Sequence, residues 1–172
     1  GGKSMSNAWD RPKVKITKTQ SERIWDIIGY SFYLGSLILL VFVWKYLPQE
    51  VPAHYNALGE VERWGSKGEL LILPGVGAFL AIFMQIFEKY PEVHNYPQRL
   101  NESNAEQFYL NSRKMLNIIK NICLILFALL LFESVSIAIG WDITFGIFFL
   151  PVTVLGLVIP IVIGIIKQRK IQ

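Results

Sequence analysis

The polar residues best suited to chemistry fall in segment 47–68, where His54 is followed closely by Glu60 and Glu62. An imidazole together with carboxylates is a donor set that suits Zn²⁺ and similar divalent ions. The spacing matches no established zinc signature, and no second histidine lies in this segment. Three roles stay open: a divalent metal site, packing of the loop with His54 bonded to a backbone carbonyl, and recognition of an external ligand.

A second candidate group lies further along the chain, where Glu133 interrupts a long apolar run and Asp142 follows it. Ionisable groups are costly inside a membrane and usually face the protein interior there. Two interpretations stay open: a protonated or water-bridged glutamate that joins helices, and an outward-facing polar pocket shared with His54, Glu60 and Asp142. The candidate ligand-binding residues of both regions are His54, Tyr55, Asn56, Glu60, Glu62, Trp64, Glu133 and Asp142.

The local sequence around His54 predicts a well-defined loop. Pro48 and Pro52 favour an extended start, because the residue before each proline is pushed toward β or polyproline geometry. Residues 56–59, ending in Gly59, are typical of a turn. Ser66-x-x-Glu69 matches a capping box that would begin the next helix, which makes Glu69 a structural residue.

Motifs of the common enzyme classes are missing from the sequence. There is no HExxH zinc-protease motif, no phosphate-binding glycine loop and no nucleophile elbow. The single cysteine, Cys123, lies in an apolar run and is interpreted as a buried thiol. We therefore expect a non-enzymatic protein, with no cofactor apart from the divalent metal considered above.

Four apolar segments must position these candidate residues. The chain of 172 residues is 52% hydrophobic and only 17% charged, which is typical of a membrane protein. A hydrocarbon core about 30 Å thick is crossed by about 20 helical residues. The segments of that length are about 27–46, 69–87, 115–139 and 147–166. The sequence thus predicts an all-α protein, a four-helix transmembrane bundle.

Lys and Arg are distributed unevenly between the two sides of such a bundle. They concentrate in the tail 1–23, in the loop 88–114 with Lys120 at its edge, and after residue 166. The loop 47–68 and its edges hold Lys45, Arg63 and Lys67, and the loop 140–146 holds none. By the positive-inside rule, both termini and the loop 88–114 are cytoplasmic. The net charge of +4 is thus explained by orientation, and no nucleic-acid partner is expected.

The inner loop is expected to continue into the third span. Ser103-x-x-Glu106 matches a second capping box, and no residue after Ala105 would stop a helix before the span begins. One long helix is therefore predicted. Side chains of this helix near the interface are expected to contact lipid headgroups: Tyr109, Arg113 and Lys114.

The domain organisation follows from these boundaries. Residues 1–23 form a cytoplasmic tail, in which residues 1–4 look like a cloning remnant before a natural start at Met5. Residues 24–172 form a single membrane domain.

The outer loop resembles a known family. The residues that carry the likeness are Leu47-Pro48, Val51-Pro52, His54-Tyr55-Asn56, Gly59-Glu60, Glu62 and Trp64-Gly65-Ser66-Lys67. This pattern is similar to a small membrane domain of unknown function that also forms the N-terminal part of the SdpI-like immunity proteins, which protect bacteria from a secreted killing peptide. The likeness covers roughly residues 27–90. The arginine-containing signature of the family's C-terminal half is missing here.

The resemblance implies a multi-pass protein of the bacterial plasma membrane. Together with the candidate residues, it favours recognition of an extracytoplasmic ligand, such as a toxin or signalling peptide or another membrane partner. Two alternatives stay open. One is an ion- or metal-handling protein that uses an outer-leaflet polar pocket, and the other is a structural accessory subunit of a membrane complex.

Overall fold

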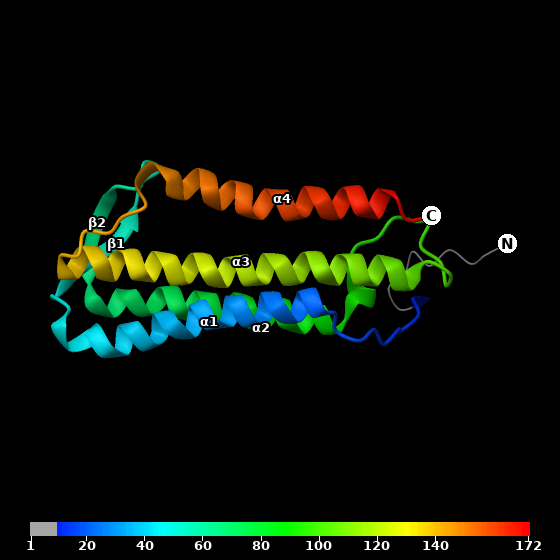
Figure 1. The fold of residues 1–172 in the computed structure, drawn as a ribbon, viewed down its shortest axis with the longest axis horizontal. Helices are drawn as coiled ribbons and strands as arrows, with labels where there is room; N and C mark the ends of the chain where they lie inside the picture. Colours follow the sequence, from blue (N-terminus) through cyan, green and yellow to red (C-terminus); the bar gives the residue numbers. More distant parts are fainter. Residues whose placement is uncertain (1–9) are drawn as a thin grey trace.

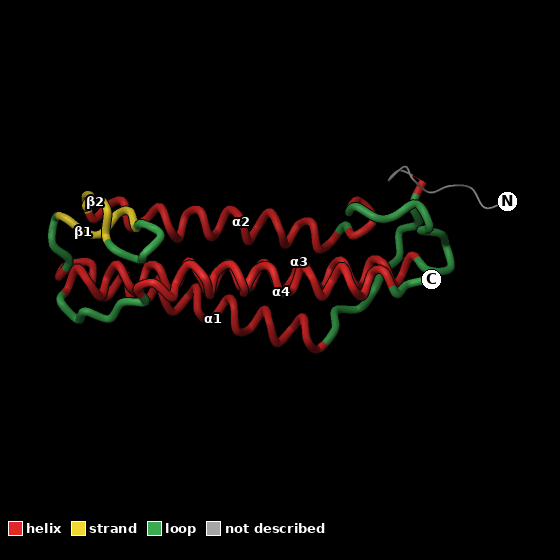
Figure 2. The backbone as a smooth tube through the Cα atoms, turned by 90° about the horizontal axis from the view of Figure 1, so that it is seen from above, coloured by secondary structure: helices red, strands yellow, loops and turns green. Residues whose placement is uncertain are grey.

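The computed structural model describes residues 10–172, so the predicted cloning remnant and the start at Met5 lie outside the described part. Four long helices form an elongated bundle (Figures 1 and 2). They are α1 (Gln20–Val43), α2 (Ile72–Lys89), α3 (Ala105–Ile139) and α4 (Phe149–Arg169). A two-stranded hairpin, β1 (Glu50–Tyr55) and β2 (Val61–Ser66), covers one end. We call this the hairpin end; the C-terminus and the loop 90–104 lie at the other, the terminal end (Figure 1).

All four helices are long and apolar enough to cross a bilayer, which confirms the four predicted helices of membrane-spanning length and indicates a multi-pass membrane protein. The expected single rod is confirmed as well, because α3 runs unbroken for 35 residues. At 1.5 Å per residue it measures about 50 Å, well beyond the hydrocarbon core.

Helix α3 is the central element of the bundle. It packs against each of the other three helices, whereas α4 touches α3 and is otherwise exposed (Figure 1). The approach of α1 to α3 requires a glycine at position 29. A Cβ atom added to Gly29 would lie 2.2 Å from the side-chain oxygen of Asn121, far inside van der Waals contact.

The predicted turn at the tip of the outer loop is confirmed. The Asn56 side-chain oxygen accepts hydrogen bonds from the backbone amides of Leu58 and Glu60, both at 3.0 Å. Gly59 adopts a φ of +78°, which other residues rarely accept. The strands on either side were not foreseen, because the prolines indicated only extended backbone. The structure is therefore helical except for this hairpin.

The hairpin is attached to the bundle through apolar contacts. Val51 of β1 is completely buried and packs with residues from the ends of α1, α2 and α3. The cluster consists of Leu40, Val43, Leu47, Val51, Leu70, Leu131 and Val135. Burial of this apolar face holds β1 in a fixed position above the helices.

Both predicted capping boxes are wrong. Ser66 makes no side-chain cap, because a 3-10 turn over residues 67–71 precedes α2; Glu69 instead pairs with Arg63 at 3.1 Å. At the start of α3 the cap position is Asn104 rather than Ser103, and the Asn101 side chain bonds the amides of both residues. A true capping box begins α1, where Thr19 and Glu22 bond each other's backbone amides.

Residues 10–19 form a strap across the terminal end. The hydroxyl of Tyr109 donates to the Pro12 carbonyl at 2.7 Å, and Arg11 donates to the carbonyls of Glu92 and His94 at 2.9 and 2.6 Å. Val14 and Ile16 of the strap pack against a buried apolar cluster that includes Tyr109. The strap thus joins the start of the chain to α3 and to the loop 90–104.

Candidate functional site

A cavity of about 530 Å³ lies at the hairpin end, between β1, the start of α2, the last third of α3 and the start of α4. Its size is ordinary for a ligand-binding site. Its apolar lining comes from all three helices and includes Ile72, Leu73, Leu130, Phe149 and Leu150. Its polar lining includes His54, Tyr55, Asn56, Arg63, Glu69, Glu133 and Ser134.

The deepest polar groups of the cavity come from β1 and α3. The hydroxyls of Tyr55 and Ser134 lie 2.7 Å apart, which fixes the hairpin over α3. Burial raises the pKa of Tyr55 to about 12, so its hydroxyl stays neutral at physiological pH. Glu133 is only 2% exposed, and a backbone hydrogen bond links its carboxyl group to Phe145. The cavity therefore offers a buried carboxyl within an apolar surface.

The structure brings only half of the predicted ligand residues together. His54, Tyr55, Asn56 and Glu133 line the cavity. The remaining four do not line it: Glu60, Glu62, Trp64 and Asp142. The sequence interpretation missed Ser134, since consecutive residues of a helix do not share a face.

The predicted metal ligands are not gathered into a cluster. His54 Nδ1 lies 2.7 Å from Glu62 Oε2, and both side chains are more than half exposed. Among residues 10–172 no group of three or more His, Cys, Asp or Glu side chains is placed to hold a metal ion. The His54–Glu62 pair is a surface contact across the hairpin.

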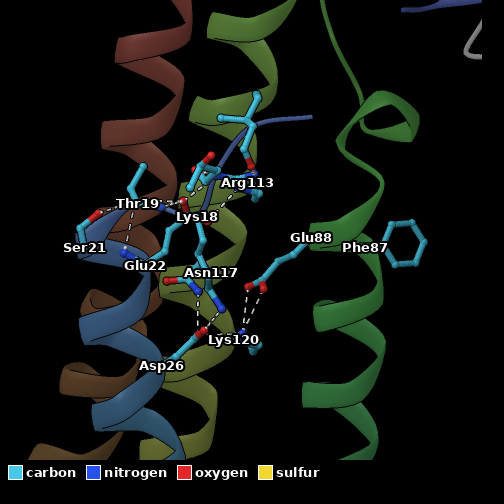
Figure 3. A network of polar contacts seen from close by, with 12 residues as sticks. Lys18, Thr19, Ser21, Glu22, Asp26, Phe87, Glu88, Arg113, Asn117 and Lys120 are labelled. Carbon is cyan, nitrogen blue, oxygen red and sulfur yellow. Dashed lines mark hydrogen bonds and ion pairs between the residues drawn. The ribbon is translucent and has the colours of Figure 1, made fainter. Parts of the chain in front are cut away.

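A second polar site, which sequence reasoning missed, lies toward the terminal end of the bundle (Figure 3). The ammonium group of Lys120 on α3 is 2.9 Å from Asp26 of α1 and 3.1 Å from both carboxylate oxygens of Glu88 on α2. Lys120 is completely buried. The amides of Asn117 and Asn121 donate to the same Asp26 oxygen at 2.8 and 3.0 Å. This acid–lysine–acid network joins three helices.

Lys120, counted with the positive charges at the edge of the inner loop, is therefore not part of that exposed charge. Because α3 already begins at Ala105, Lys120 lies about four turns inside the helix. Asn117, Lys120 and Asn121 share one face at spacings of three and four, which was the available sequence signal. That face is directed at α1 and α2.

Two of the three predicted lipid-headgroup residues instead make their contacts within the protein. Tyr109 has no exposed surface, because the strap covers it. Arg113 bonds both carboxylate oxygens of Glu22 at 2.8 and 2.9 Å and donates to the carbonyls of Ile16 and Thr17. Lys114 lines a shallow groove between α3 and α4.

The two polar sites are separated by apolar packing. Between Lys120 and Glu133 the inner face of α3 carries the buried residues Leu124, Ala128 and Leu131. The separation along the helix is about 20 Å. An ion path through the bundle would have to cross this apolar layer. The hairpin-end cavity is therefore treated as a site separate from the Lys120 network.

Known proteins match the chain in part. The family model "Domain of unknown function (DUF1648)" matches residues 32–78, which include the second half of α1, the hairpin and the start of α2. An "Uncharacterized protein" of Archaeoglobus fulgidus is 36% identical over 96 residues, or 51% of each chain. The chain thus spans about half the length of that relative. No solved structure matches.

One titratable group at the terminal end gives a testable pH dependence. His94 Nε2 donates to the Phe87 carbonyl and Nδ1 lies within hydrogen-bond distance of the Ser112 hydroxyl, both at 2.7 Å. Burial lowers its pKa below the ordinary value of 6.5. The contribution of His94 to stability is complete above pH 6.5 and is lost as pH falls below it, because the unfolded chain then binds a proton that the folded chain excludes.

Thermal unfolding in detergent between pH 7.5 and 5.5 measures this effect. The wild type should lose up to about 1.4 kcal/mol per pH unit from this group. His94→Gln should lose less over the same range, whereas His54→Gln, at the exposed surface of the hairpin, should behave like the wild type. Equal pH profiles for all three proteins would contradict the assignment.

Proposed function

We propose that this protein is a non-enzymatic receptor-like protein of the plasma membrane that binds an extracytoplasmic ligand in the hairpin-end cavity. Both termini face the cytoplasm in this proposal, since Lys and Arg concentrate at the terminal end. The hairpin then faces outward and closes over the cavity.

The observation that carries the proposal is the cavity itself. It lies where segments distant in sequence meet, and its lining combines a broad apolar surface with a buried carboxyl at Glu133. Binding sites commonly combine apolar walls with a few fixed polar groups. The matched domain supplies the hairpin and part of this wall, since it covers β1, β2 and the start of α2.

The lining also indicates the chemical class of the ligand. Apolar side chains of three helices suit one or two large hydrophobic groups, and a carboxyl group suits a hydrogen-bond donor or a cation beside them. A short apolar stretch of a peptide that contains a basic residue meets both requirements. Immunity against a secreted peptide or detection of a signalling peptide would use this kind of recognition.

A cavity-filling substitution tests the proposal. Leu130→Trp places bulk in the cavity, and Val152→Trp on the exposed face of α4 is the matched control. We expect cells that express the wild type or the control to resist cationic apolar peptides, and cells with Leu130→Trp to lose at least tenfold of that resistance. The measurement is the inhibitory concentration of each peptide against a strain that lacks the gene. Equal resistance with and without Leu130→Trp would contradict the proposal.

A further inference from the structure

A separate polar cavity of about 320 Å³ lies at the terminal end, between the strap and the last turn of α2. Its lining includes the charged residues Lys15, Lys18, Glu22, Glu88, Lys89 and Arg113. Helices α1 and α2 lie on different sides of α3 and diverge toward this end, as Figure 2 shows.

The charges around this cavity do not cancel. Three ion pairs account for most of them: Arg113 with Glu22, Lys18 with Asp26, and Lys120 with Glu88. Lys15 of the strap and Lys89 of α2 remain, and neither has an ion-pair or hydrogen-bond partner among residues 10–172. Both are exposed at the rim, so the site has two positive charges in excess.

The position of this site favours a lipid over a soluble anion. Helix α1 begins at Gln20 and α2 ends at Lys89, so the rim lies where both apolar helices emerge from the bilayer. Directly below the rim both helices expose large apolar side chains, among them Ile27 of α1 and Ile86 of α2. Acyl chains can lie along these faces while a headgroup occupies the polar cavity.

We propose that this cavity binds the headgroup of an anionic phospholipid, with Lys15 and Lys89 on either side of its phosphate. A zwitterionic lipid supplies its own ammonium group and gains less from two excess lysines. The bound lipid would connect the strap to α2, because Lys15 belongs to the strap and Lys89 to α2. This site is independent of the hairpin-end cavity and of the function proposed for it.

Native mass spectrometry of the full chain, purified with phosphatidylglycerol or phosphatidylcholine, tests the proposal. The wild type should retain phosphatidylglycerol in preference to phosphatidylcholine. The double variant Lys15→Gln/Lys89→Gln should retain it roughly thirtyfold more weakly, as expected for two lysines near an anionic headgroup. The control Lys13→Gln/Lys170→Gln, also exposed at the terminal end, should match the wild type.

Three outcomes would overturn the assignment: equal retention of both lipids, equal retention by wild type and double variant, and displacement of the lipid by millimolar inorganic phosphate. The last result would identify a free anion as the ligand. Because Lys15 and Lys89 are exposed, the double variant should unfold at the wild-type temperature when no lipid is present. That measurement separates loss of the site from loss of the fold.

Discussion

Replacing Lys120 by methionine should lower the free energy of unfolding by about 3–5 kcal/mol, because it leaves two carboxylates without their shared cation. Lys120 has no exposed surface, and its ammonium group contacts Asp26 and Glu88 at 2.9 and 3.1 Å. Methionine fills much of the same volume, so the loss reflects charge rather than a cavity. Unfolding followed by tryptophan fluorescence in detergent measures the change.

Neutralising the partners should reverse most of this loss. The triple variant Lys120→Met/Asp26→Asn/Glu88→Gln removes the orphaned charges and should recover more than half of the lost stability. Lys114→Met, two turns earlier on the same helix and without a charged partner in the described residues, should change stability by less than about 0.5 kcal/mol. If the single and triple variants are equally unstable, the network contributes to stability through packing of its side chains rather than through charge.

Replacing Arg113 by methionine is expected to cost about 3 kcal/mol and to release the strap. Glu22 is 2% exposed and would lose its cationic partner, while the carbonyls of Ile16 and Thr17 would lose their donors. Because these carbonyls belong to the strap, the substitution should weaken the attachment of the strap as well as lower the stability of the whole protein. Hydrogen exchange of residues 11–19 should accelerate even at temperatures where the bundle stays folded.

Arg23, an exposed residue next to Glu22 on the first turn of α1, provides the matched control. Arg23→Met removes an equal charge but leaves Glu22 with its partner Arg113. Its effect on exchange of the strap should be negligible. Conversely, unchanged strap exchange in Arg113→Met would show that Tyr109 and the apolar strap contacts suffice to hold it.

Much of the bundle could be predicted from the sequence because a bilayer imposes a length on every crossing. Long apolar runs therefore locate α1 to α4, and the absence of any breaker after Ala105 predicts the continuous α3. Helix starts were less predictable. Ser66 and Ser103 have the right spacing for capping boxes, but a 3-10 turn and the competing side chain of Asn101 decide those boundaries.

The candidate site was predictable only where neighbours in sequence are neighbours in space. Tyr55 and Asn56 accompany His54 on the same hairpin, so they could be grouped with it. The contact between Tyr55 and Ser134 depends on how β1 packs against α3, and local sequence patterns carry no information about that packing. The same reason explains the missed network: Asp26 meets Asn121 across 95 positions, through the rotation of two helices about their axes.

That long separation has a consequence for how the chain is made. At translation rates of about 5–20 residues per second, α1 leaves the ribosome on the order of ten seconds before its partners on α3. During that interval Asp26 has only the nearby Lys18 beside it, and Glu88 lacks its lysine entirely. The first two helices are thus made before Lys120, the cation of α3 that pairs with Asp26 and Glu88 in the folded protein. The polar network between the helices is therefore complete only once α3 has been made, however early α1 is delivered to the membrane.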